Sequence, residues 1–177
     1  MATISLWKVD NRLDHVIDYA ANIEKTSLKD KEDLKDVLDY ATRSTKTEQK
    51  LFVNALNCSP ASAYEQMQET KKEYGKKNGI LAFHGYQSFA PGEVTPEVAH
   101  EIGMKFAQQM WGDSFEVVVA THLDTDCCHN HFVLNSVSFV DGKKYYRSEK
   151  DYQKKLLRIP AFSRWLSSKG KLLDELN

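Results

Sequence analysis

The chain has 177 residues, a formal net charge of −1 and a hydrophobic fraction of 41%. These values predict one globular domain that is large enough to bury a core. No apolar run approaches the roughly 20 residues that a membrane-spanning helix needs, and the N-terminus lacks a signal-peptide pattern. We therefore expect a cytoplasmic protein without membrane insertion. Its three cysteines, two of them adjacent, are a poor basis for a disulfide framework and favour reduced thiols.

In chain order, short strands first alternate with amphipathic helices, and the later strands then follow one another. Two helix starts, at Ser59-Pro60 and Thr95-Pro96, combine an N-cap residue with proline at the first helical position. The predicted strands are 4–9, 50–56, 80–89, 115–122 and 129–140. The predicted helices are 11–21, 30–41, 59–74 and 95–111.

Near the C-terminus, Asp141-Gly142 indicates a hairpin turn into a return strand over 143–147. This order of elements predicts an α+β fold, with a central antiparallel sheet flanked by helices that lie on one face. We expect a domain over residues 1–147. The helical tail over 148–177 is either part of that domain or an extension of it.

Charge is unevenly distributed along the chain. Residues 143–171 contain ten Lys and Arg against two acidic residues. Phosphate binding needs a local basic surface, which this segment could supply. A solvated basic helix is the alternative and, for a charge run alone, the more common case.

Three histidines between positions 122 and 131 form the most informative motif. His129 and His131 are two apart at the start of a predicted strand, so their side chains share a face. His122 ends the preceding strand, and a short connection folds it back beside the pair. Three imidazoles without an evident fourth ligand predict an open, catalytic metal site. Asp124 and Asp126 in the connection could orient a ligand imidazole.

Two non-catalytic roles stay open for these histidines. A single His-x-His pair is usually surface or core filler. A structural zinc site that includes Cys127 or Cys128 is less favoured, because adjacent cysteine side chains diverge and no second pair has zinc-ribbon spacing. His84 and His100 are placed outside the metal set, and His84 either faces a ligand or is packed in the core.

The histidine motif His122…His129-Asn130-His131 resembles the signature of the HUH endonucleases and, in detail, that of the MobA/MobL (MOBP-type) conjugative relaxases. Further blocks of residues 3–147 follow the order of that family. These blocks are Arg12-Leu13, Ile17-Asp18-Tyr19-Ala20, Glu24-Lys25-Thr26, Asn57-Cys58-Ser59-Pro60, Gln87-Ser88-Phe89, Pro91-Gly92-Glu93-Val94-Thr95-Pro96-Glu97 and Asn135-Ser136-Val137.

The resemblance implies a central antiparallel sheet with the histidine pair on a middle strand. It implies that the three histidines hold a divalent ion, Mn²⁺ or Mg²⁺, with Zn²⁺ or Ni²⁺ as substitutes. Tyr19 would be the nucleophile, although Tyr40 has the same local sequence and competes for this role. Asp124 joins the catalytic group. The residues that would contact DNA are Ser88, Lys25 and Arg12.

The function implied by the resemblance is strand-specific nicking of a transfer origin, with a 5′-phosphotyrosyl intermediate. Its partners would be single-stranded DNA, a relaxosome accessory protein and a type IV coupling protein. A tyrosine upstream of the histidines favours a relaxase over a rolling-circle replication initiator or a transposase, which stay as alternatives. A non-catalytic DNA-binding accessory protein is the alternative outside this enzyme class.

Overall fold

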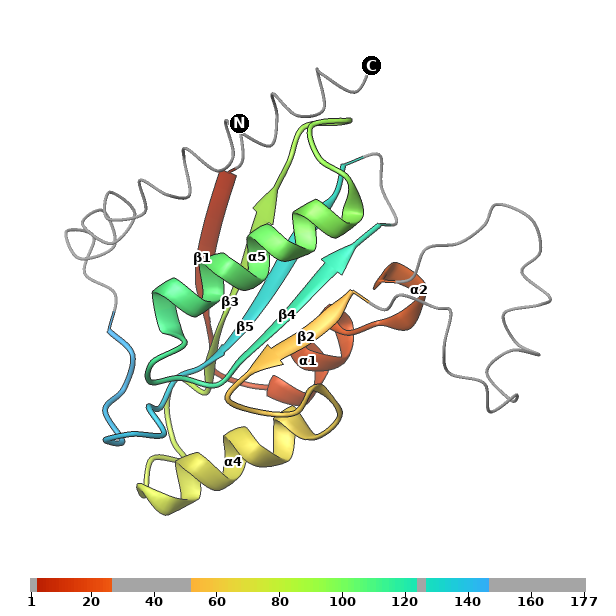
Figure 1. The fold of residues 1–177 in the computed structure, drawn as a ribbon. Helices are drawn as coiled ribbons and strands as arrows, with labels where there is room; N and C mark the ends of the chain where they lie inside the picture. Colours follow the sequence, from red (N-terminus) through yellow and green to blue (C-terminus); the bar gives the residue numbers. More distant parts are fainter. Residues whose placement is uncertain (1–2, 27–51, 124–126, 147–177) are drawn as a thin grey trace.

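A five-stranded antiparallel sheet forms the centre of the structure, a computed structural model that describes residues 3–26, 52–123 and 127–146 (Figure 1). The strand order across the sheet is β1-β3-β5-β4-β2, and every neighbouring pair is antiparallel. The strands are β1 (Thr3–Val9), β2 (Val53–Leu56), β3 (Ala82–Ser88), β4 (Val117–His122) and β5 (His129–Asn135). The helices are α1 (Leu13–Ala20), α2 (Ile23–Thr26), the 3₁₀ turn η1 (Pro60–Ser62), α4 (Ala63–Glu73) and α5 (Pro96–Trp111). The predicted α+β class is confirmed, and the histidine pair lies on the middle strand.

Helices cover both faces of this sheet, so the prediction of helices on one face is wrong (Figure 1). Val117 and Val119 of β4 pack against α5, whereas Val118 and Ala120 pack against α1 and α4. Successive side chains of a strand point to opposite faces, and an apolar run therefore needs cover on both. The uninterrupted Val117–Ala120 run carried this signal in the sequence.

Several elements differ from their predicted bounds. Strand β5 ends at Asn135, not at 140, and the predicted return strand contributes a single bridge between Val137 and Lys144. The chain leaves the sheet because the Ser138 hydroxyl oxygen accepts hydrogen bonds from the backbone of Val140 and Asp141. The Asp141-Gly142 turn itself is confirmed. The predicted helix over 59–74 begins as the 3₁₀ turn η1 before α4.

Some predicted segments lie outside the described residues, namely the helix over 30–41 and the tail over 148–177. The predicted strands at 4–9, 50–56 and 80–89 correspond to the observed β1, β2 and β3. The helix start at Thr95 is confirmed, because its hydroxyl oxygen accepts a hydrogen bond from Val98 N. In the described part of the chain, every helix is too short or too polar to cross a bilayer.

Candidate metal centre

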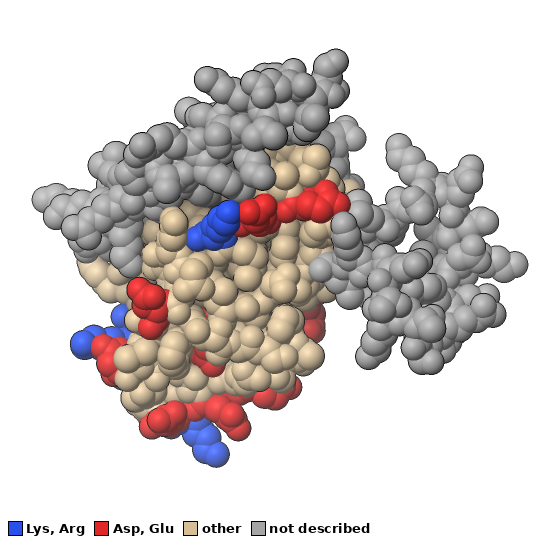
Figure 2. Space-filling model, in the orientation of Figure 1, with Lys and Arg blue, Asp and Glu red and all other residues tan. Residues whose placement is uncertain are grey.

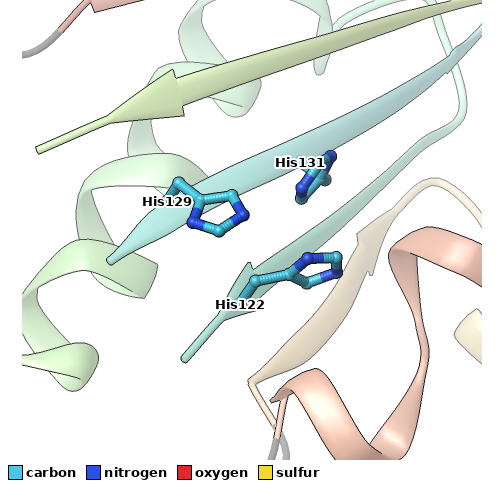
Figure 3. Close-up of side chains that lie close together, drawn as sticks. All are labelled: His122, His129 and His131. Atoms are coloured by element: carbon cyan, nitrogen blue, oxygen red, sulfur yellow. The ribbon is translucent and has the colours of Figure 1, made fainter. Parts of the chain in front are cut away.

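The three predicted histidines meet at one end of the sheet. His122 is the last residue of β4 and pairs with His129, the first residue of β5, while His131 pairs with Ala120. All three side chains therefore project from the same face of two adjacent strands (Figure 3). One ligand nitrogen from each ring lies within 4.8 Å of the others. The sequence prediction of a convergent three-histidine cluster is confirmed.

Hydrogen bonds fix which nitrogen of each ring carries the proton. His122 Nε2 donates to the carbonyl oxygen of Ala20 at 2.9 Å, and His129 Nδ1 donates to the carbonyl oxygen of Cys127 at 3.1 Å. A carbonyl can only accept, so the lone pairs lie on His122 Nδ1 and on His129 Nε2. A metal ligand needs such a lone pair, with the other ring nitrogen held by a neighbour.

His131 completes the set through a fourth histidine. His131 Nδ1 lies 2.9 Å from His84 Nε2, and the two rings stack with centroids 5.1 Å apart. His131 Nε2 is buried and has no hydrogen-bond partner among the described residues. A buried polar atom without a partner is unfavourable unless a ligand completes it. The open nitrogen of His131 is therefore the best evidence in the structure for a metal-binding role.

His84 is the site residue that sequence reasoning missed. It lies on β3, four residues before Ser88, and pairs with Val133 of β5. Its separation in sequence from the other histidines does not indicate that it contacts their cluster. Only the β3–β5 register shows that its ring reaches His131, so no local motif could have found it.

Burial keeps the imidazoles of His84 and His131 neutral. It lowers the pKa of His84 to about 4, with a smaller contribution from the positive charge that His122 can carry. Burial, followed by the neighbouring imidazoles His122, His84 and His129, lowers the pKa of His131 to about 2. Neutral imidazole is the form that binds a metal ion.

The residue between the two histidines of β5 anchors the strand from the opposite face. The amide group of Asn130 donates to the backbone oxygen of Ala99 at 2.7 Å and accepts from the hydroxyl of Thr121 at 2.6 Å. Helix α5 approaches closely here because residue 103 is glycine, where a Cβ would lie 2.6 Å from the Asn130 amide nitrogen. These contacts hold the start of β5 in place while both histidines face the other way.

Tyr19 lies over the histidine cluster, near the end of α1. Its ring centroid is 5.4 Å from that of His122 and 5.5 Å from that of His131. The ammonium of Lys25 lies 4.5 Å from the centre of the Tyr19 ring. Tyr19 is 47% exposed, so the ring is accessible from solvent. The competing Tyr40 lies outside the described residues.

The other predicted site residues lie at different distances from the cluster. Ser88 pairs with His129 and is partly buried beside it. Arg12 precedes α1, about 10 Å along the helix axis from Tyr19 at the usual rise per residue, and bonds to Asp14 at 3.4 Å. Arg12 is thus not part of the histidine cluster. Asp124 and Asp126 lie outside the described residues.

His100 and the cysteine thiols are not members of the metal-binding group. His100 is held between Thr121 Oγ1 at 2.8 Å and Asn54 Oδ1 at 2.7 Å, which agrees with its placement outside the metal set. Within the described residues the metal-binding group consists of histidines only. Three neutral imidazoles without a thiolate are typical of a catalytic site that keeps an open position.

The antiparallel sheet carries a three-histidine cluster at the ends of two adjacent strands. These two features define the class of protein as an α+β protein with a candidate metal centre on its sheet. Comparison with known proteins narrows this class. Residues 40–158, more than half of the chain, match the relaxase family described as MobA/VirD2-like, nuclease domain. The chain belongs to this family.

Individual relatives agree with this assignment. Two Staphylococcus aureus proteins named Protein rlx are 42% and 40% identical over 97 and 104 residues, or 55% and 58% of this chain. The group II intron-interrupted relaxase LtrB of Lactococcus lactis is 41% identical over 71 residues, 40% of this chain. The matched regions span 30% and 32% of the two staphylococcal proteins and 13% of LtrB. No solved structure matches the chain.

Proposed function

We propose that this chain is the nuclease part of a conjugative relaxase, which cuts one DNA strand at a transfer origin and stays joined to the cut end through Tyr19. Membership of the relaxase family supports the class of reaction. The position of the Tyr19 ring is the observation that carries its assignment as the nucleophile. The centroid of this ring lies 5.4 Å from that of His122 and 5.5 Å from that of His131.

In the proposed reaction the phenolic oxygen of Tyr19 attacks the phosphorus of one phosphodiester. The bond between that phosphorus and the 3′ oxygen breaks, Tyr19 loses its proton, and the departing 3′ oxygen gains one. The product is a 5′-phosphotyrosine and a free 3′-hydroxyl. One diester replaces another, so the reverse reaction can reseal the strand without an external energy source.

His122, His129 and His131 would hold the divalent ion, for which we propose Mn²⁺ or Mg²⁺. When bound, such an ion stabilises negative charge on the non-bridging oxygens of the phosphate. The residues around the cluster keep the three ligand nitrogens available. Ala20 O and Cys127 O accept from His122 and His129, and His84 Nε2 would accept from His131 Nδ1 when His131 Nε2 binds the ion.

Side chains next to the cluster are suited to bind DNA. Lys25, at the Tyr19 ring, would pair with a backbone phosphate, and Ser88, beside His129, would donate a hydrogen bond to one. The opposite face of the sheet is poorly suited, because the exposed charged residues of α5 are two acidic and one basic, Glu97, Glu101 and Lys105. Acidic side chains also lie on the face that Figure 2 shows. DNA would therefore lie on the face covered by α1.

Partners of the whole relaxase follow as part of the proposal. The substrate would be single-stranded DNA at the transfer origin. A relaxosome accessory protein and a type IV coupling protein would bind the larger protein of which this region forms the nuclease. The relatives that this chain matches are much longer than the matched regions, which agrees with such a division.

A covalent-adduct assay tests the proposal. Labelled single-stranded oligonucleotides tiled across the DNA next to the gene are incubated with the protein and Mn²⁺, then separated in denaturant. We expect one oligonucleotide to form an adduct that resists denaturation, that EDTA prevents and that added Mn²⁺ restores. Tight binding without an adduct under all of these conditions would contradict the proposal and favour an accessory DNA-binding protein.

A further inference from the structure

A groove leads away from the histidine cluster between β1 and α1. It encloses about 320 Å³, and Tyr19 and His84 line it at the end next to the cluster. Trp7, Lys8 and Arg12 line the remainder, together with His15. The groove and the candidate metal centre thus share two residues and form one continuous surface.

The side chain of Trp7, which lines the groove, is unusually exposed. It is 43% exposed although tryptophan is among the largest apolar side chains. Its indole contacts the ring of His84 at 4.8 Å and that of Tyr86 at 5.5 Å, both edge to face. These contacts from β3 hold the indole in place while part of its surface remains open to the groove.

Both basic and acidic residues line the groove, among them Arg12 and Asp10. Lys8 also lines it, but it follows Trp7 on β1, so its side chain points to the opposite face of the sheet from the indole. The Arg12 guanidinium pairs with both carboxylate oxygens of Asp14 at 3.4 Å through Nε and Nη2, and its other N–H donors remain available for a phosphate. An exposed aromatic ring beside an Arg side chain is typical of surfaces that bind single-stranded nucleic acid.

We propose that this groove binds an unstacked base of single-stranded DNA, which stacks on the indole of Trp7. The base belongs to a nucleotide near the phosphate at the histidine cluster, so the inference rests on the proposed function. A base inside a duplex is already stacked on its neighbours and cannot lie on Trp7. The groove therefore selects single-stranded DNA, and it does so with little preference among bases because every base has a π-face.

The test separates base contacts from phosphate contacts. Binding of fluorescein-labelled oligothymidylate and of an abasic oligomer of equal length is measured by fluorescence anisotropy in EDTA, where no cleavage occurs. We expect Trp7→Ala to weaken oligothymidylate binding by about 5- to 100-fold and abasic binding by less than about twofold. Trp7→Phe, which keeps an aromatic face, should retain most of the affinity.

Two controls keep the test decisive. Tyr64→Ala removes an exposed aromatic ring of α4 outside the groove and should leave both affinities unchanged. If Trp7→Ala does not fold, as judged by circular dichroism, Trp7→Leu and Trp7→Phe supply the comparison, with loss expected only for Leu.

Equal effects of the Trp7 substitutions on the two oligomers, or no effect on either, would overturn the inference. This outcome is independent of nicking. A protein that forms no covalent adduct but loses base-dependent binding in Trp7→Ala would contradict the proposed function alone.

Discussion

Strand β5 carries polar side chains at both ends of one face, and the two ends are completed in different ways. At the histidine end, His131 Nε2 is buried without a hydrogen-bond partner among the described residues. At the asparagine end, Asn135 is fully buried, accepts from Lys71 Nζ at 2.5 Å and donates to Glu116. Glu116 in turn accepts from the hydroxyl of Thr70 at 3.0 Å. Contacts among the described residues satisfy the second end but leave His131 Nε2 at the first end without a partner.

This difference separates a structural polar network from a candidate binding site. Both ends are buried on the same face, one beneath α1 and the other beneath α4. A satisfied buried network stabilises the fold, and removing one member leaves its partners without hydrogen bonds. A buried nitrogen without a partner makes no hydrogen bond. The free-energy cost of burying it is therefore offset only when a ligand binds. The following predictions would break or sharpen this contrast.

The largest effect is expected at the histidine end, on metal binding. His131→Leu removes the ligand nitrogen and should weaken Mn²⁺ binding by at least about 100-fold, measured by isothermal titration calorimetry. The free energy of unfolding without metal should fall by less than about 1.5 kcal/mol, because removal of a buried unpaired nitrogen offsets part of the lost hydrogen bond to His84. Unchanged Mn²⁺ affinity would contradict the metal centre.

The asparagine end should respond in the opposite sense. Asn135→Leu leaves Lys71 and Glu116 as buried charged groups without their shared partner. We expect urea denaturation to show a loss of about 3–5 kcal/mol in the free energy of unfolding. If the variant still folds, its Mn²⁺ affinity should stay near that of the wild type. If Asn135→Leu lowered the free energy of unfolding by less than His131→Leu does, the proposed contrast between the two ends would be contradicted.

His84 should affect metal affinity through His131. His84→Ala removes the acceptor for His131 Nδ1 and should weaken Mn²⁺ binding by about 10- to 100-fold, as is typical of residues that orient a metal ligand. His84→Gln keeps an acceptor oxygen and should recover part of the affinity.

His100 supplies the matched control for His84. Burial lowers its pKa to about 4, as for His84, but it bonds to Thr121 and Asn54 instead of to a cluster histidine. His100→Gln should therefore leave Mn²⁺ affinity unchanged. Equal losses in the His84 and His100 variants would indicate a general packing effect.

The smallest effect concerns the pH dependence of stability at the asparagine end. Burial lowers the pKa of Lys71 to about 8, against the opposing effect of Glu116. In the unfolded chain this ammonium keeps its proton up to about pH 10.4. Between these values the unfolded state binds more protons, so the Lys71 contribution to stability rises with pH and is lost as pH falls through 8.

Lys71→Met should abolish this rise. Urea denaturation of both proteins at pH 8 and above should show the difference between them growing with pH in favour of the wild type. The comparison cancels the opposing contribution of Cys58, whose pKa burial raises to about 11. Parallel pH profiles for the two proteins would show that Lys71 does not titrate as proposed.

The histidine motif was predictable because its chemistry is local. Two histidines at strand spacing and a third at the preceding strand end are enough to predict convergence, and the register of β4 with β5 confirms it. His84 was not predictable, because its contact with His131 depends on the pairing of β3 with β5, which no local pattern encodes. The valine run of β4 encodes cover on both faces, whereas the order of the elements alone predicts helices on one face.

The end of β5 shows a further limit. Residues that favour strands, namely Val137, Phe139 and Val140, follow Asn135, and the sequence therefore predicts a longer strand. The Ser138 hydroxyl and the Asp141-Gly142 turn redirect the chain after Asn135. Side-chain hydrogen bonds to the local backbone override strand propensity in this way.

The central claim is that Tyr19 and the histidine cluster form one catalytic centre. The most direct measurement is to digest the covalent protein–DNA adduct with protease and nuclease and to locate the nucleotide by mass spectrometry. We predict a nucleotide on the peptide that contains Tyr19, and no adduct from Tyr19→Phe. A nucleotide on Tyr40, or an undiminished adduct from Tyr19→Phe, would contradict this account.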